Sequence, residues 1–185
     1  MKEKQLFDYL ERLSNLLRNE MRTEGSEYGL QPIQMEALYY LSICNRYSDT
    51  PMGVTEYLGQ TKGTVSQTIK VLEKKGLITK NADKNDKRLT HLKMTLEGKT
   101  LLAKTIPPPK FSDACDVLNQ SESDAVTEAL NNLLKTLQKK NNLKAFGTCK
   151  ACRHNIRNTD GSCLCGLTKE PLSEKDIELI CREYE

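Results

Sequence analysis

The chain has 185 residues, of which 37% are hydrophobic and none is tryptophan, so we expect one moderate core and a smaller appendage. It has no run of about 18 apolar residues and no apolar segment after a basic N-terminus. We therefore expect no membrane span and no secretory signal, and we place the protein in the cytoplasm. The formal net charge is only +3, but residues 51–104 hold eleven Lys and Arg against five Asp and Glu.

Two helices are predicted before this basic segment. Residues 2–22 carry an apolar stripe at helical spacing, formed by Leu6, Tyr9, Leu10, Leu13, Leu16 and Leu17. Residues 32–46 begin with proline in the first turn and read as a core helix. We expect the first helix to bury its stripe against another surface.

The order of elements between Val54 and Gly98 predicts a winged helix-turn-helix. A short helix and a tight turn lead into a second helix over residues 61–76, whose apolar positions Val65, Ile69 and Leu72 form one buried stripe. Gly76 ends that helix where a left-handed cap is expected. Residues 77–79 and 89–95 then read as two strands around a basic turn, which is the wing.

The exposed side chains of this unit suit double-stranded DNA. Short polar groups on a helix can read base edges in the major groove, and basic wing residues can reach the minor groove or the phosphates. Ser66 and Gln67 have the chemistry for bases. The predicted DNA contacts are Lys62, Thr64, Ser66, Gln67, Lys70, Lys84, Lys87 and Arg88. The alternative is a winged helix that serves protein contact or structure.

More helices are predicted after the wing. One runs from Leu96 to about residue 106, where three consecutive prolines stop it, and the chain resumes over residues 112–119. A further helix over residues 122–143 has Ser121 as its N-cap and Asp124 in a capping-box position. Its apolar stripe consists of Val126, Ala129, Leu130, Leu133, Leu134 and Leu137.

Residues 64–78, Asp83, residues 86–88 and residues 96–98 resemble the core pattern of the MarR family of bacterial transcription regulators, with a weaker match over about residues 28–141. The resemblance implies a homodimer in which the first and last helices pair with those of a second subunit. Such a dimer would place its recognition helices ~34 Å apart on a palindromic operator. The alternative is that both apolar stripes pack within one monomer.

The resemblance also implies roles for the wing and for a ligand. The wing hairpin would be braced by Asp83, Asp86 and Arg88, which would also contact DNA. A small-molecule effector would bind between the winged helix-turn-helix and the dimerisation helices. Lys87 stands where the family more often has arginine, so it keeps the charge without the bidentate geometry. The proline run departs from the long helix usual in the family.

Residues 146–185 lie outside this pattern and hold five of the seven cysteines. In a cytosolic chain such clustering favours metal over disulfides. Cys149 and Cys152 form a close pair, and a short helix capped by Ser173 is expected to deliver Cys181. The predicted metal ligands are Cys149, Cys152, Cys165 and Cys181, with Cys163 as the alternative third ligand. A nitrogen ligand at His154 is also conceivable, although a surface histidine is preferred.

One Cys-x2-Cys pair with two separate cysteines and a following Tyr184 resembles small modules that hold a four-iron cluster of the high-potential type. An iron–sulfur cluster, [4Fe-4S], is therefore favoured slightly over Zn²⁺. An unliganded, disordered tail is the other interpretation. Cys44 and Cys115 lie on apolar helical segments and are expected to be buried.

The expected fold is mainly α with a small β wing: a winged helix-turn-helix with a helical dimerisation region and a small Cys-rich C-terminal module. We divide the chain into a dimerisation helix (1–28), the DNA-binding domain (29–106), dimerisation helices (107–143) and a metal-binding module (144–185). The expected function is sequence-specific regulation of transcription, as a repressor, responding to redox or metal state. The alternatives are a small-molecule-responsive regulator whose metal is structural, and an electron-transfer or cluster-scaffold protein.

We do not expect an enzyme. The sequence has no phosphate-binding glycine loop, no nucleophile elbow and no His-Glu-x-x-His motif, and His91 stands alone on a wing strand.

Overall fold

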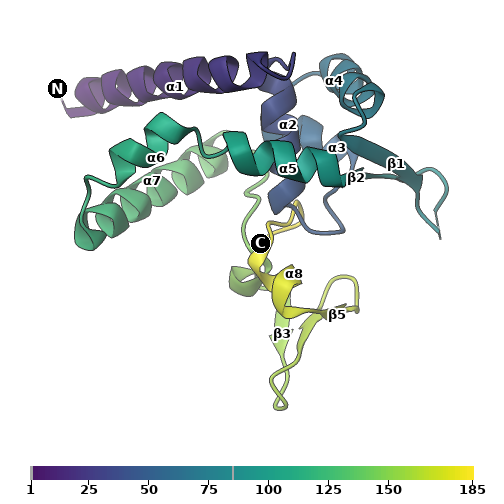
Figure 1. Ribbon diagram of the computed structural model, residues 1–185. Coiled ribbons are helices and arrows are strands. Elements are labelled where there is room, and N and C mark those ends of the chain that lie inside the picture. Colours follow the sequence, from purple (N-terminus) through teal and green to yellow (C-terminus); the bar gives the residue numbers. More distant parts are fainter. Residues whose placement is uncertain (1, 85) are drawn as a thin grey trace.

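The computed structural model describes residues 2–84 and 86–185, apart from the side chain of Lys2. Its mainly helical architecture with a small antiparallel wing matches the expected fold class (Figure 1). The elements up to the wing and just beyond it are α1 (Lys2–Ser26), α2 (Pro32–Ile43), α3 (Pro51–Leu58), α4 (Lys62–Lys74), β1 (Ile78–Ala82), β2 (Thr90–Met94) and α5 (Leu96–Thr105). Within the described part of the chain, no helix is long and apolar enough to cross a membrane.

The second half of the chain forms a short helix, a long helix and a small folded tail. Its elements are α6 (Pro109–Cys115), α7 (Gln120–Lys140), a 3₁₀ turn η1 (Cys149–Ala151), β3 (Asn155–Arg157), β4 (Cys163–Cys165), β5 (Pro171–Leu172) and α8 (Glu174–Glu178). The three short strands make one antiparallel sheet in the order β3-β4-β5. The tail is thus folded, and we call residues 144–185 the cysteine module.

Threonine caps fix where the helices of the winged unit begin. The hydroxyls of Thr50, Thr61 and Thr95 each accept a hydrogen bond from the backbone N–H three residues later, at the starts of α3, α4 and α5. Beyond α4, Gly76 adopts φ +70°, as expected for a left-handed cap, and the chain turns directly into β1.

The winged unit has one continuous core. Val65, Ile69 and Leu72 on α4 are buried as predicted, and they pack in a cluster with α2, the wing and α5. The largest fully buried side chains include Tyr40, Met35 and Leu38, all on α2. Helix α2 is therefore the central helix of the winged unit, in agreement with the sequence.

An aromatic contact joins the cysteine module to this core. Phe146 packs edge-on against Tyr40 and Tyr57, with ring centroids 5.9 and 5.2 Å apart. At the next position a Cβ on Gly147 would lie 2.5 Å from the ring of Tyr184, so a larger residue there would have to displace this ring. The first residues of the module are therefore part of the core of the winged unit.

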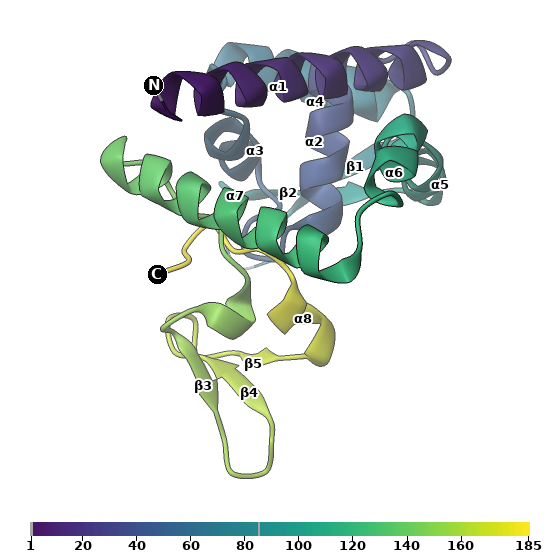
Figure 2. The ribbon, with the colours of Figure 1, turned by 90° about the vertical axis from the view of Figure 1, so that its left-hand side faces the viewer.

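Backbone hydrogen bonds complete the junction. The N–H of Ile180 donates to the carbonyl of Ile43, and the N–H of Asn45 donates to the carbonyl of Ile180, both at 2.9 Å. On the other side, the N–H of Cys181 donates to Gly147 O at 2.9 Å. The end of the chain thus lies between the end of α2 and the start of the module, and the module lies on the opposite side of α2 from α1 (Figures 1 and 2).

The predicted dimerisation helices project from the side of the winged unit opposite the wing (Figure 1). Their apolar stripes are open: Leu13 on α1 is 50% exposed and Leu134 on α7 is 55% exposed. No residue of α6 or α7, all of which are described, is buried. The stripes do not pack within one monomer, so that alternative is wrong.

Two predicted helix starts are wrong. Helix α6 begins at Pro109 rather than at residue 112, because proline is well suited to the first position of a helix. Helix α7 is capped by Asn119, whose side chain and that of Glu122 form the capping box, instead of Ser121 and Asp124. In both cases an earlier residue satisfied the same local rule.

Two predictions about cysteines also need correction. Ser173 caps α8 as expected, but the helix ends at Glu178, so Cys181 is placed by its backbone bond to Gly147 and not by the helix. Cys44 is buried as expected, whereas Cys115 is exposed because α6 has no partner surface within the subunit.

Candidate nucleic-acid interface and cysteine cavity

The outward face of α4 carries all five polar side chains that the sequence singled out. Lys62, Thr64, Ser66, Gln67 and Lys70 are exposed, opposite the buried stripe. The hydroxyl of Thr64 lies 2.9 Å from that of Thr61, so it is engaged at the helix cap. Ser66 and Gln67 follow within the first turns, which is where a recognition helix contacts base edges.

The wing turn is organised by its two aspartates. Asp83 Oδ1 accepts the backbone N–H of Asp86 at 2.8 Å, and Asp86 binds the guanidinium of Arg88 through two contacts of 3.0 Å. This hydrogen bonding by Arg88 lowers the pKa of Asp86. Lys84, Lys87 and Arg88 are exposed at the same turn, so three basic groups stand on a turn that the carboxylates hold in shape.

His91 ties the wing to the loop between α2 and α3. Its Nδ1 donates to the carboxylate of Asp49, its Nε2 lies 3.1 Å from Asp83 Oδ2, and Lys93 also binds Asp49. Burial disfavours the charged imidazole, but the hydrogen bonds and charges of the two aspartates outweigh it and raise the pKa of His91. The sequence suggested that His91 stands alone; Asp49 is 42 residues away, so spacing gave no signal.

The cysteine module encloses a cavity beside the end of α2. Its volume is about 30 Å³, which is room for roughly one water molecule. The predicted ligands Cys149, Cys152, Cys165 and Cys181 all line it, together with Asn45, Tyr47, His154, Asn155, Leu167, Thr168, Leu172 and Glu183. Among the described residues, Cys163 lies in the adjoining apolar cluster but is not in the cavity wall. His154 is half-buried in the wall and not a plain surface histidine.

The thiols stand around this space and do not close on one point. In residues 2–84 and 86–185, no three His, Cys, Asp or Glu side chains are arranged to hold a single metal ion. Cys149 and Cys181 interact directly, and a hydrogen bond from the Cys149 thiol lowers the pKa of Cys181.

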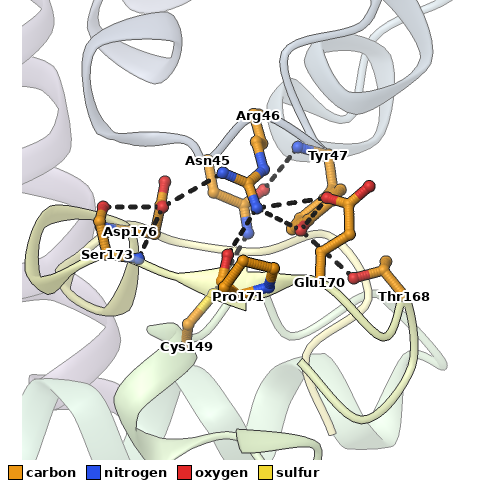
Figure 3. A network of polar contacts seen from close by, with 9 residues as sticks. All are labelled: Asn45, Arg46, Tyr47, Cys149, Thr168, Glu170, Pro171, Ser173 and Asp176. Carbon is orange, nitrogen blue, oxygen red and sulfur yellow. Dashed lines mark hydrogen bonds and ion pairs between the residues drawn. The ribbon is translucent and has the colours of Figure 1, made fainter. Parts of the chain in front are cut away.

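Asn45, in the loop after α2, directs a donor at this site. Its Nδ2 donates to Cys149 Sγ at 3.2 Å, and its Oδ1 accepts from the Tyr47 N–H at 3.1 Å (Figure 3). The same Oδ1 also accepts from Ser48 Oγ at 2.8 Å. The two bonds to Oδ1 fix the orientation of the amide. Asn45 is only 1% exposed. The sequence pattern gave no indication of this residue.

Two arginines clamp the module to the winged unit. Arg46 donates to Tyr47 Oη and Pro171 O at 2.8 Å each and to Glu170 Oε2 at 3.2 Å, as Figure 3 shows. Arg182, next to Cys181, binds Glu56 on α3 with two N–H groups. The module is therefore held at both the α2–α3 loop and the first helix of the helix-turn-helix.

These features define a winged helix with an added cysteine module. Residues 28–89 match the family model described as MarR family, which leaves the module outside the match. The chain is 26% identical over 126 residues to the transcriptional repressor MprA of Escherichia coli strain K12, covering 67% of this chain and 71% of that protein.

Solved structures show the same fold. FabT of Streptococcus pneumoniae in complex with DNA is similar with a TM-score of 0.58 and 25% identity, covering 75% of this chain and 99% of FabT. A MarR transcriptional regulator from Methanosarcina mazei Go1 has a TM-score of 0.62 at 17% identity, covering 74% of this chain and 99% of that one.

The bridge at His91 predicts a pH-dependent stability. Because the folded-state pKa is raised above the unfolded value of about 6.5, the stabilisation is full below that value and is lost as pH rises through the folded pKa. Urea unfolding at a series of pH values should show this loss, and His91→Asn should remove it. His154→Asn is the control. Equal pH dependence in wild type and His91→Asn would contradict the prediction.

Proposed function

We propose that the chain is a MarR-family transcription regulator that binds a near-palindromic operator as a homodimer and represses. The observation that carries the proposal is the exposed polar face of α4 beside a basic wing, in a segment that matches the MarR family model. The similar protein MprA is described as a repressor, and FabT was solved with DNA bound. Both similarities support the proposal that this chain binds DNA and represses transcription.

Within this proposal the side chains divide by chemistry. Ser66 and Gln67 read base edges, with the amide of Gln67 suited to an adenine. Lys62 and Lys70 contact phosphates from the same helix, and Lys84 and Lys87 do so from the wing. Arg88 is oriented by its two contacts with Asp86, which present its guanidinium at the tip of the wing.

Base and phosphate contacts should separate in a binding assay. With an operator selected from random duplexes, Gln67→Ala should cost about 1–3 kcal/mol of discrimination at one base position. Lys70→Ala should weaken binding to all duplexes and reduce the salt slope by about one. Fluorescence anisotropy at several salt concentrations measures both, with Lys150→Ala in the module as control. Two variants with identical salt slopes and unchanged sequence preference would count against the assigned roles.

The homodimer is supported by the unpartnered helices. Exposed apolar side chains run along both arms: Leu6, Phe7, Tyr9, Leu13 and Leu16 on α1, and Val126, Leu130, Leu134 and Leu137 on α7. A second copy would cover both stripes at once and place two reading helices on one face of the duplex. This matches the pairing of first and last helices that the family resemblance implies.

Charges placed in the stripes should give monomers. Leu13→Asp combined with Leu134→Asp puts carboxylates where apolar faces meet, so we expect half the wild-type mass in size-exclusion chromatography with light scattering. Operator affinity should fall by on the order of a hundredfold, because each half-site is then bound separately. Ile156→Asp, an exposed position on β3, is the control. A double variant that remains dimeric would contradict the proposed interface.

We further propose that the cysteine module is the input of the regulator, through a metal or cluster held by its thiols. Asn45 and Arg182 support this, since they connect the cavity to the α2–α3 loop and to Glu56 on α3. The same loop contacts the wing, where the Leu92 N–H donates to Asp49 O at 2.7 Å. The cavity is therefore connected by direct contacts to α3 and to the wing, so a change at the cavity can alter the position of both.

Removing the close thiol pair tests this input. Cys149→Ser with Cys152→Ser should change operator affinity while the circular dichroism of the winged unit persists, and Cys163→Ser should behave as wild type. Unchanged affinity in a folded double variant would remove the module from the mechanism. A regulator that then still responds to small organic compounds would be the small-molecule-responsive alternative.

A further inference from the structure

We infer that the cleft between the winged unit and α8 of the cysteine module binds a small organic phosphate, held by Lys93, Lys99 and Lys175. We call this space the basic cleft. It is distinct from the small cavity between the cysteines, since the two spaces share only Asn45 among the described residues that line them. The inference goes beyond the proposed function, because it depends neither on DNA nor on the thiols.

The basic cleft is large enough for a small molecule. Its volume is about 510 Å³, which is within the usual range of roughly 300–1,000 Å³ for ligand pockets, and it is open to solvent. Its walls come from the end of α2 with the following loop, from β2, from the start of α5 and from α8. The module therefore supplies one wall of the site and the winged unit supplies the others.

Part of the lining is apolar. Leu92 and Cys44 are buried, and half-buried side chains complete this surface, namely Leu41, Met94 and Leu179. Hydrocarbon surface inside a cleft favours a ligand with an apolar body, because contact removes both surfaces from water. An inorganic ion alone would leave this part of the cleft unused.

The carboxylates of the lining are already paired with cations. Asp176 binds Arg46 at 3.4 Å, as Figure 3 shows. Asp49 is only 4% exposed and binds Lys93. A cationic ligand would have to displace a positive side chain from one of these carboxylates. The paired carboxylates thus do not make the cleft a site for cations.

Three lysines converge on the cleft from three different elements. Lys93 lies on β2, Lys99 on α5 and Lys175 on α8, and all three are exposed. Within the described part of the chain, neither Lys99 nor Lys175 belongs to an ion pair. Positive groups around a cleft with apolar walls concentrate a positive potential there. The lining therefore favours an anion placed between the lysines.

The number and type of these cations favour phosphate over a single carboxylate. A phosphate monoester carries a charge of about −1.5 to −2 near neutral pH and has three acceptor oxygens. Ammonium groups act as point charges, so lysines that approach from different sides can each bind one oxygen. Such a ligand would connect Lys175 of the module to Lys99 of the winged unit.

Phenyl phosphate is a suitable probe, because it joins an apolar ring to a phosphate. Isothermal titration of the full chain in low salt should show saturable binding, with a Kd of about 1 mM or tighter. Inorganic phosphate should bind more weakly, and phenol, which lacks the charge, should give no saturable signal. Absence of phenyl phosphate binding would overturn the inference, as would tighter binding of the dicarboxylate phthalate.

Lysine variants locate the bound probe. Lys99→Ala and Lys175→Ala should each weaken binding of phenyl phosphate about tenfold, because each removes a charge-assisted hydrogen bond. Lys104→Ala, on the same helix as Lys99 but outside the lining, is the matched control. Ser42→Phe places a ring in the cleft from an exposed position and should abolish binding. Equal weakening by Lys99→Ala and Lys104→Ala, or unaltered binding in folded Ser42→Phe, would place the probe elsewhere and contradict the assignment.

Binding to DNA is measured separately. Phenyl phosphate binding by a chain that selects no DNA sequence would overturn the proposed function and support the basic cleft. If Lys99→Ala and Lys175→Ala weaken operator binding while phenyl phosphate does not bind the wild type, the lysines contact the duplex and the inference is wrong.

Discussion

The backbone pairing of Ile180 with the end of α2 determines how the cysteine module is placed against the winged unit. It fixes Cys181 and Arg182 beside the α2–α3 loop, where one lines the cavity and the other reaches Glu56 on α3. Because a bridge of this kind has no side-chain specificity, it would be weak without Phe146, which packs in the core from the opposite end of the module. The module is thus attached at both its first and last residues.

The α2–α3 loop is the shared element of the two sites. Asn45, Ser48, Asp49 and Thr50 are all buried polar residues, each with hydrogen-bond partners inside the protein. Asn45 faces the cysteines and Asp49 faces the wing. A buried polar network with satisfied partners is rigid, because any displacement leaves a desolvated group unpaired. Movement of the loop at one end therefore has to be accommodated at the other.

The sequence was most informative where structure depends on neighbours in the chain. The stripe of Val65, Ile69 and Leu72, the turn at Gly76 and the cap at Ser173 follow local rules, and all three were predicted. Asn119 and Ser121 are both suitable N-cap residues, and the local pattern does not show which of them begins α7. The boundary of α6 was missed for the same reason.

Long-range contacts were beyond the sequence. The Asn45–Cys149 bond joins residues 104 positions apart, and nothing in either segment points to the other. The four cysteines that the spacing singled out do line one cavity, although in the described chain no three ligand-type side chains are arranged around a single point. The spacing could not distinguish Cys163 from Cys165 on physical grounds, since residues two apart on a strand share a face. The cavity that separates them depends on Asn45 and Tyr47, which belong to the other unit.

The open stripes of α1 and α7 have a consequence for the protein in the cell. In the proposed homodimer these stripes would be covered only on association, so the stability of α1 and α7 would depend on protein concentration by mass action. At low abundance α1 and α7 of a lone subunit would be exposed to proteases. The amount of active regulator would then fall more steeply than its rate of synthesis, which gives a gene under its control a threshold rather than a proportional response.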